Sequence, residues 1–156
     1  MDPLALEQQV CFALAVTNRA VLAVYRPILE PLGLTHPQYL VLLVLWDEHN
    51  DPAATGAMSV KQIAAKLQLD SATLSPMLKR LAAMGLLSRT RSAADERATD
   101  VTLTAAGIAL RERAKSIPGT VVERLGVELS ELEQLREVLT RINAAALAAG
   151  ALGAPR

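Results

Sequence analysis

Residues 59–85, SVKQIAAKLQLDSATLSPMLKRLAAMG, predict two helices joined by a tight turn. The first helix follows a capping box, Ser59 to Gln62, in which each side chain accepts a hydrogen bond from the other residue's backbone N–H. The second runs from Ser71 to just before Gly85, a residue type that often follows the last turn of a helix. Apolar residues recur at three- and four-residue spacing in both helices, so each presents one face to a core.

A β-hairpin is expected directly after these helices. Residues 86–92 and 100–104 partly alternate polar and apolar side chains, and residues 93–99 between them are polar and turn-like. Two helices, a short turn and a hairpin, in that order, predict a winged helix-turn-helix, and the chain as a whole is expected to be mainly α with a small β-hairpin wing.

Further helices are expected on both sides of this motif. They cover approximately residues 4–29, 35–46, 104–116 and 130–149, with a loop at 50–58. The second begins with a capping box at Thr35, the third is interrupted at Pro118-Gly119, and the last begins with a capping box at Ser130. The composition agrees, since 51% of residues are hydrophobic but only 3% are aromatic.

The N-terminus has no basic region of the kind that begins a signal peptide. The longest uninterrupted apolar run, residues 40–46, is too short to cross a bilayer. A cytoplasmic protein with no membrane partner is therefore expected.

Charge is distributed unevenly along a chain whose net charge is zero. Residues 1–58 carry −4, residues 59–104 carry +3, and residues 105–156 carry +1. A neutral total argues against a general polyanion binder, whereas a positive middle third is expected if that region alone meets phosphate.

The outward face of the second helix supplies the candidate DNA-reading residues. Short hydroxyl side chains permit close approach to a groove floor, and a basic pair nearer the C-terminus can reach phosphates. These residues are Ser71, Thr73, Ser75, Lys79 and Arg80. Pro76 within the same helix removes a backbone donor, at ~3 kcal/mol, and either kinks the helix for function or only improves its packing.

The wing adds Arg89 and Arg91 on a strand and Asp95 and Arg97 at its tip. An arginine on an exposed tip can enter a minor groove, and Asp95 can hold Arg97 through a charge-assisted hydrogen bond. The alternative is a solvated turn with a surface ion pair worth ~0–1 kcal/mol.

Cys11 is the single cysteine of the chain. An intramolecular disulfide and a cysteine-built zinc site are therefore excluded. Cys11 is either a buried structural thiol or a reactive thiol whose second sulfur comes from outside the chain.

The motifs resemble those of the MarR family of winged-helix repressors. Residues 69–81, 85–89 and 95–97 follow the family pattern from recognition helix to wing. Residues 25–29 and 35–40, together with a cysteine in the first helix, are similar to the organic-hydroperoxide-sensing regulators within that family.

This resemblance implies a homodimeric repressor on a palindromic double-stranded DNA operator, without enzyme activity, metal or cofactor. It assigns residues 1–34 to a sensor and dimerisation helix, 35–104 to the winged helix-turn-helix, and 105–156 to C-terminal dimerisation helices. Organic hydroperoxide would oxidise Cys11 to a sulfenic acid, and a low-molecular-weight thiol would capture it as a mixed disulfide and release the DNA.

The resemblance also implies that tyrosine hydroxyls surround the reactive cysteine. Tyr25 and Tyr39 fit as candidate partners of the thiol, whereas His36 and Ala15 stand where relatives carry tyrosine. Cys11 and Tyr25 are 14 residues apart, about 21 Å on one straight helix, so Tyr25 and His36 must come from the other subunit if they surround the thiol. His36 is then a hydrogen-bond or pH-dependent partner of Cys11, or an ordinary surface histidine.

Two other functions remain open. One is a MarR-type repressor released by a small apolar or phenolic ligand, with Cys11 structural. The other is a peroxidatic thiol enzyme, which is poorly supported because no strand-rich pattern surrounds Cys11. His36 and His49 are too few for a metal site.

Overall fold

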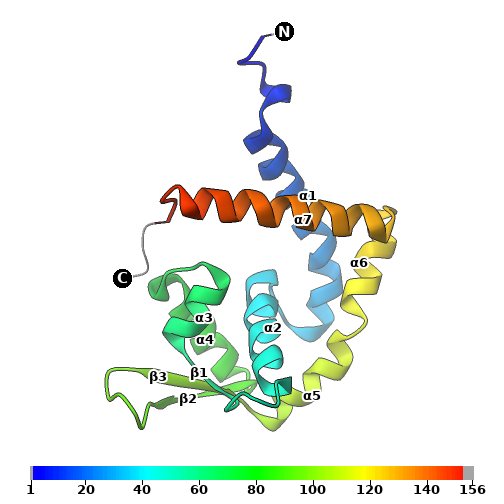
Figure 1. Cartoon of the computed structure of the whole chain (residues 1–156). Helices are drawn as coiled ribbons and strands as arrows, with labels where there is room; N and C mark the ends of the chain where they lie inside the picture. The colour runs from blue at the N-terminus through cyan, green and yellow to red at the C-terminus, as the bar shows by residue number, and fades with distance from the viewer. Residues whose placement is uncertain (1, 153–156) are drawn as a thin grey trace. The chain divides into compact units, whose positions relative to one another are not determined.

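The computed structural model describes residues 2–152 as helices with one small sheet (Figure 1). This confirms the expected fold class. The chain divides into two compact units, Met1–Ile117 and Pro118–Arg156, which are described separately below.

Unit 1 contains five α-helices and a three-stranded sheet within its described residues. Its elements are 3-10 helix η1 (Leu6–Gln8), α1 (Val10–Leu29), 3-10 helix η2 (Glu30–Leu32), α2 (His36–Asn50), β1 (Ala57–Ser59), α3 (Val60–Leu67), α4 (Ser71–Ala83), β2 (Leu87–Arg91), β3 (Thr99–Leu103) and α5 (Ala105–Ala114). The predicted helix-turn-helix is α3 and α4, and the predicted hairpin is β2 and β3.

The sheet has the strand order β1-β3-β2, with both pairs antiparallel. Val101 of β3 lies opposite Met58 on one side and Arg89 on the other. The sequence prediction was wrong for β1, which lies in the segment expected to be a loop. A strand of three residues is too short to show the alternation of polar and apolar side chains that predicts a strand. Only its hydrogen bonding with β3 identifies it.

The core of unit 1 forms around α2, which packs against α1, α3, α4, α5 and the sheet. Leu42 of α2, Ile63 of α3 and Leu74 of α4 are fully buried. Trp46, expected to be a core residue, is 3% exposed, and its indole Nε1 donates to the backbone oxygen of Gly107, 2.9 Å away. This bond ties α2 to the first turn of α5.

Two of the predicted capping boxes are confirmed. Thr35 Oγ1 accepts from the backbone N–H of Gln38, whose side chain accepts from that of Thr35. Ser59 and Gln62 repeat the arrangement. Ser59 Oγ accepts from the backbone N–H of Gln62 at 3.1 Å, and Gln62 Oε1 accepts from that of Ser59 at 2.8 Å. These reciprocal bonds pair the free donors at the beginnings of α2 and α3.

The predicted beginning of the first helix at Leu4 is wrong. Gln9 has extended backbone angles, so η1 ends at Gln8 and α1 begins at Val10. The side-chain amide of Gln9 donates to the backbone oxygen of Pro3, 2.8 Å away. Cys11 therefore occupies the first turn of α1.

Unit 2 contains most of α6 (Ile117–Leu125) and α7 (Leu129–Ala148). The predicted interruption is present but lies at residues 115–116, between α5 and α6, and α6 itself was not predicted. Pro118 lies in the first turn of α6, where its missing N–H has no helical partner to lose. The predicted capping box at Ser130 is wrong. Glu128 is the N-cap of α7, and its backbone N–H donates to the Glu131 carboxylate.

One helical stretch within residues 2–152, Val10–Leu32, is long and apolar enough to cross a bilayer by length and composition. Its mean hydropathy is 1.2. Polar residues interrupt this stretch, so a search for uninterrupted apolar runs in the sequence does not find it. Length and composition do not distinguish such a helix from one that pairs with another helix. Asn18 and Arg19 near its middle favour helix pairing, because polar side chains at mid-bilayer are costly.

The packing around Gly107 predicts a sensitive position. A Cβ atom there would lie 2.0 Å from the backbone oxygen of Leu86, which cannot move away as a flexible side chain can. We expect Gly107→Ala to lower the free energy of unfolding by about 1–3 kcal/mol, measured by urea denaturation. Gly119→Ala in α6 is the matched control, because nothing lies within 4 Å of its added Cβ. Equal stability of the two variants would contradict the packing.

Candidate functional site

The first turn of α4 is held by Asp70, a residue not selected from the sequence. Asp70 is the N-cap of α4, and its Oδ1 accepts from the backbone N–H of Thr73 at 2.6 Å. Its Oδ2 accepts from Thr73 Oγ1 at 3.0 Å. The bond from the Thr73 N–H, and then that from its hydroxyl, hold the pKa of the Asp70 carboxyl below its usual range. Asp immediately before a predicted helix is a capping signal that could have identified it.

A second hydroxyl in the same helix is also bonded to the protein. Ser75 Oγ donates to the backbone oxygen of Ser71, 2.8 Å away. Pro76 follows, and α4 continues through it to Ala83. Because proline has no N–H, the Ala72 carbonyl receives no helical hydrogen bond from position 76.

The division of α4 into two faces agrees with the sequence pattern. Leu74, Leu78 and Leu81 are fully buried. The six candidate DNA-binding residues of this helix are all exposed, namely Ser71, Thr73, Ser75, Pro76, Lys79 and Arg80. The burial of one face therefore presents the other to solvent as a polar and basic surface.

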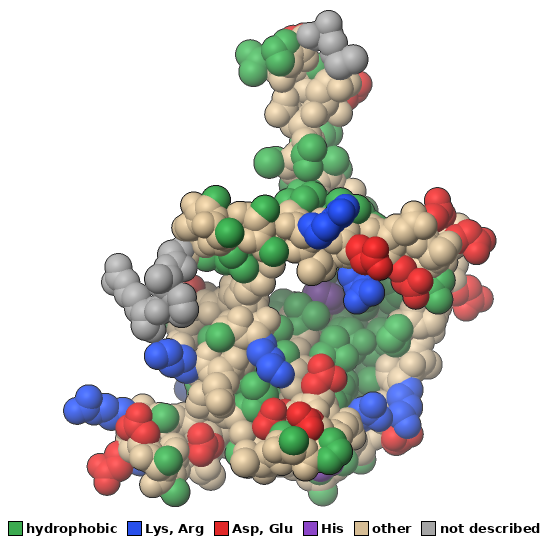
Figure 2. All heavy atoms as spheres, in the orientation of Figure 1, with side chains coloured by type: hydrophobic (Ala, Val, Ile, Leu, Met, Phe, Trp, Pro, Cys, Tyr) green, Lys and Arg blue, Asp and Glu red, His purple; other side chains and the backbone are tan. Residues whose placement is uncertain are grey.

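The wing presents Arg89 and Arg91 from β2, and both are exposed. The expected side-chain bond between Asp95 and Arg97 is not formed. Asp95 Oδ1 instead accepts from the backbone N–H of Arg97 at 3.0 Å, because this short link closes the tight turn. Figure 2 shows blue and red side chains gathered at this end of unit 1.

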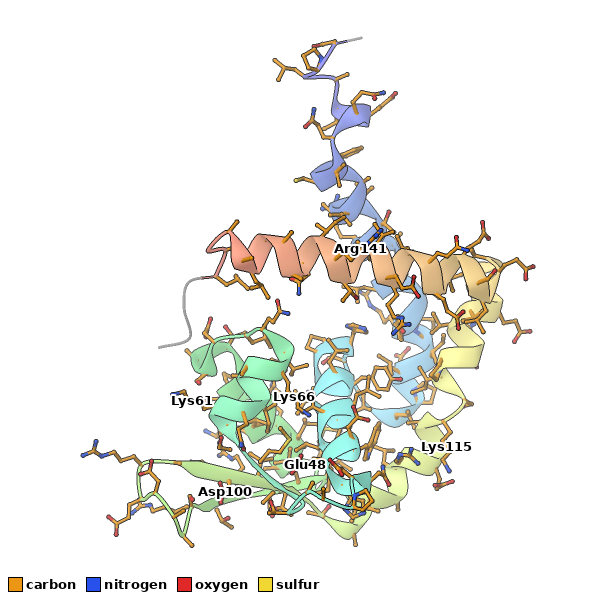
Figure 3. All side chains as sticks on the ribbon, in the orientation of Figure 1. Glu48, Lys61, Lys66, Asp100, Lys115 and Arg141 are labelled. Carbon is orange, nitrogen blue, oxygen red and sulfur yellow. The ribbon has the colours of Figure 1, made fainter. Side chains whose placement is uncertain are left out.

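Lys61 and Lys66 of α3 are additional exposed cations of the helix-turn-helix (Figure 3). From the sequence they were counted in the positive middle third but were not placed in a site. Their position on the first helix of the helix-turn-helix could have been inferred, since that helix crosses the DNA backbone in proteins of this architecture.

Cys11 lies at the exposed beginning of α1. Its apolar neighbours are also exposed, with Val10 at 63% and Leu14 at 40% of their surface. Within one chain, the thiol is therefore not a buried structural residue. Figure 1 shows the first turns of α1 extending away from the other elements of unit 1.

Tyr25, His36 and Tyr39 form an aromatic cluster between α1 and α2. The ring centroids of Tyr25 and His36 are 4.8 Å apart in an edge-to-face arrangement, and Tyr39 lies 6.1 Å from Tyr25 and 6.3 Å from His36. Burial raises the pKa of both tyrosines and lowers that of His36. The cluster therefore favours a neutral imidazole between two neutral phenols.

Cys11 and this cluster lie at different ends of α1. One continuous helix, Val10–Leu29, carries both Cys11 and Tyr25. Their 14-residue separation corresponds to about 21 Å along the axis. The structure thus brings Tyr25, His36 and Tyr39 together and keeps Cys11 of the same chain away from them.

The chain matches known transcriptional regulators over most of its length. A family model described as "Transcriptional regulator SarA/Rot" matches residues 23–113. The organic hydroperoxide resistance transcriptional regulator of Bacillus subtilis is 41% identical over 138 residues, which make up 88% of this chain and 89% of that protein.

Two solved proteins illustrate the structural likeness. Reduced AbfR of Staphylococcus epidermidis bound to DNA has a TM-score of 0.75 and 30% identity, covering 92% of this chain and 93% of the other; a disulfide form of AbfR has a TM-score of 0.60 and 29% identity, covering 92% and 90%. BpsR of Bordetella bronchiseptica, whose DNA binding is regulated by 6-hydroxynicotinic acid, has a TM-score of 0.77 and 26% identity, covering 91% and 98%.

The helix-turn-helix with its buried inner face, its exposed polar face and the adjoining hairpin define a winged-helix DNA-binding protein. More particularly, the chain belongs to the SarA/Rot family of transcriptional regulators, which has the MarR-type fold. Members of this family are regulators of transcription.

The environment of His36 predicts a pH dependence of folding. Burial lowers the pKa of His36 in the folded chain, so as pH falls below ~6.5 the unfolded chain takes up the proton first. The free energy of unfolding should therefore decrease from pH 8 towards pH 5. His36→Phe retains an aromatic ring but cannot take up a proton. We expect its free energy of unfolding, measured by urea titration, to decrease less than that of the wild type over this pH range. The control is His49→Gln, which removes the other histidine, at the exposed end of α2. Its free energy of unfolding should differ between pH 8 and pH 5 by as much as that of the wild type. Identical pH profiles for His36→Phe and wild type would rule out this contribution.

Proposed function

We propose that this regulator is a repressor that binds a palindromic operator while Cys11 is reduced and releases it when organic hydroperoxide oxidises Cys11. The observation that carries this proposal is the position of the single thiol in the first turn of α1, where its own chain leaves it exposed. A negatively charged sulfur there lies at the positive end of the helix dipole. The Bacillus subtilis relative is a regulator of organic hydroperoxide resistance, which supports peroxide as the oxidant.

The oxidation step needs only the thiolate and the peroxide. The Cys11 sulfur attacks the distal peroxide oxygen, an S–O bond forms, the O–O bond breaks, and the alkoxide leaves and takes up a proton to become an alcohol. Sulfur loses two electrons to the peroxide and becomes a sulfenic acid. No bound cofactor takes part in this step.

The second sulfur must come from another molecule, because Cys11 is the single cysteine of the chain. A low-molecular-weight thiol attacks the sulfenic sulfur, an S–S bond forms, the S–O bond breaks, and water leaves. The product is a mixed disulfide on Cys11, and excess thiol can reverse it by exchange.

A homodimer built from the terminal helices accounts for the exposed apolar side chains. In unit 1 these include Val10 and Leu14 near Cys11. In unit 2, α7 has no buried residue within the described chain, and Leu135, Val138 and Ile142 recur at helical spacing with 40–46% of their surface exposed. Such faces are typical of helices that pair with another subunit. The likeness to DNA-binding regulators supports a cytoplasmic location.

The partner subunit then supplies the surroundings of Cys11. Tyr25, His36 and Tyr39 cannot approach Cys11 of their own chain, because about 21 Å of helix separates Cys11 from Tyr25. Antiparallel pairing of two copies of α1 would bring the beginning of one helix to the end of the other. His36, neutral through burial, would donate a hydrogen bond to the sulfur in place of a tyrosine hydroxyl.

Release by a small phenolic or heteroaromatic ligand is the second candidate function. The specific observation in its favour is the similarity to BpsR, whose DNA binding responds to 6-hydroxynicotinic acid. The identity of 41% to a regulator of organic hydroperoxide resistance supports oxidation ahead of release by a ligand.

The redox proposal predicts a response confined to the thiol. We expect stoichiometric cumene hydroperoxide plus glutathione to reduce operator affinity of the wild type at least tenfold, and dithiothreitol to restore it. Cys11→Ser should bind DNA normally and stay bound after the same treatment. Fluorescence anisotropy and intact mass spectrometry measure the two effects together.

Three results would contradict this proposal. If wild type and Cys11→Ser responded equally, release by a small ligand would remain as the candidate function. Loss of DNA binding by an unmodified protein would exclude the mixed disulfide. Multiple turnover of peroxide without operator binding would indicate a thiol enzyme.

The two-subunit site can be tested with mixed dimers. Co-expression with two affinity tags yields a dimer of one Cys11→Ser subunit and one His36→Phe subunit, in which the remaining Cys11 faces the intact His36 of the other subunit. We expect this dimer to react with peroxide at the wild-type rate per thiol. The matched control carries both substitutions in one subunit, so that the remaining Cys11 faces a phenyl ring instead of the imidazole and should react slowly. The reverse order of rates would place His36 and Cys11 of one chain together.

A further inference from the structure

The exposed face at the beginning of α4 offers hydrogen-bond acceptors and methyl groups but few free donors. Thr73 Oγ1 gives its proton to Asp70 Oδ2, and Ser75 Oγ gives its proton to the Ser71 backbone oxygen. Both side chains are exposed and stand on the helix that enters the DNA groove in winged-helix proteins.

From this arrangement we infer that Thr73 is a specificity-determining residue that reads a thymine through its methyl group, with Asp70 as the positioning residue. Asp70 binds the backbone N–H and the hydroxyl of Thr73 at the same time. These two bonds select one rotamer of a β-branched side chain that has few rotamers available. The hydroxyl is thereby turned towards the N-cap, and the methyl group remains as the contact on the other side of Cβ.

The chemistry of the base edges explains the choice of thymine. Guanine presents two acceptors, O6 and N7, in the major groove and needs a donor from the protein. Thr73 has no proton left to give, and the neighbouring Asp70 carboxylate repels an acceptor-rich edge. Thymine presents the C5-methyl group, for which a threonine methyl is a suitable apolar partner.

The side-chain cations of this helix do not change this conclusion. Lys79 and Arg80 lie two turns beyond Thr73, near the C-terminal end of α4. At that distance from the groove-entering turn they suit phosphate contacts, which fix position but carry no sequence information. Sequence discrimination by Thr73 therefore depends on shape and methyl contact rather than on a donated hydrogen bond.

The test uses duplex DNA selected from a randomised pool by the full-length reduced protein. The selected duplex is synthesised again with deoxyuridine in place of thymine, one symmetric pair of positions at a time, which removes only the methyl group. We expect one pair of positions at which the change weakens wild-type binding about fourfold per half-site, the factor for one buried CH2-sized group.

Two variants of Thr73 separate the methyl group from the hydroxyl. Thr73→Ser retains the hydroxyl that bonds Asp70 but has no methyl, so deoxyuridine should cost it no affinity at that position. Thr73→Val retains a methyl group but cannot donate to Asp70, so a smaller loss than in the wild type is expected. Circular dichroism and melting temperatures establish that both variants are folded. Absence of any deoxyuridine effect, or an effect that persists in Thr73→Ser, overturns the inference.

Asp70→Asn tests the positioning role without removing the N-cap, because asparagine is also a good N-cap. Its side-chain amide would donate to Thr73 Oγ1 and free the threonine proton for a base. We expect the affinity ratio between the thymine duplex and one with guanine at that position to fall relative to wild type. A general gain in affinity from the lost negative charge cancels in this ratio. An unchanged ratio would show that Asp70 only caps the helix.

Discussion

The buried leucine face of α4 is the constraint on which the rest of this protein depends. Leu74, Leu78 and Leu81 are fully buried among α2, α3 and the sheet, and their burial determines which side of α4 meets solvent. Hydrophobic burial is not directional by itself, but a helix with one apolar face can satisfy it in only one rotation about its axis. Because the leucines occupy the buried face of α4, the hydroxyl and basic side chains lie together on its exposed face.

The proposed redox site depends on a second constraint, the length of an α-helix. A helix rises by about 1.5 Å per residue, so residues near its two ends cannot share a pocket within one chain. In this protein, the thiol lies at one end of α1 and the aromatic cluster at the other. The proposed sensor, which uses both, therefore requires a second copy of the chain, and the proposed oxidation would act at the contact between the two subunits.

Much of this arrangement could be predicted from local sequence. The helix-turn-helix, the hairpin and the capping boxes at Thr35 and Ser59 depend on residues close together in the chain, and all of them are confirmed. The sequence predictions were wrong where residues far apart in the chain determine an element, or where two local patterns could each begin a helix. Strand β1 is defined by pairing with β3, and the N-cap of α7 is Glu128 although Ser130 has an equally suitable local pattern.

The sequence by itself determined the class of protein, the single thiol and the identity of the exposed residues on α4, because periodicity and composition are properties of neighbouring positions. Only the tertiary structure decided what those residues have available for chemistry. It showed that the Thr73 and Ser75 hydroxyl protons are already donated, that Asp95 bonds the Arg97 backbone, and that three aromatic rings meet between α1 and α2. Hydrogen bonds and ring contacts depend on distances of a few ångströms and on direction, which sequence spacing constrains only in part.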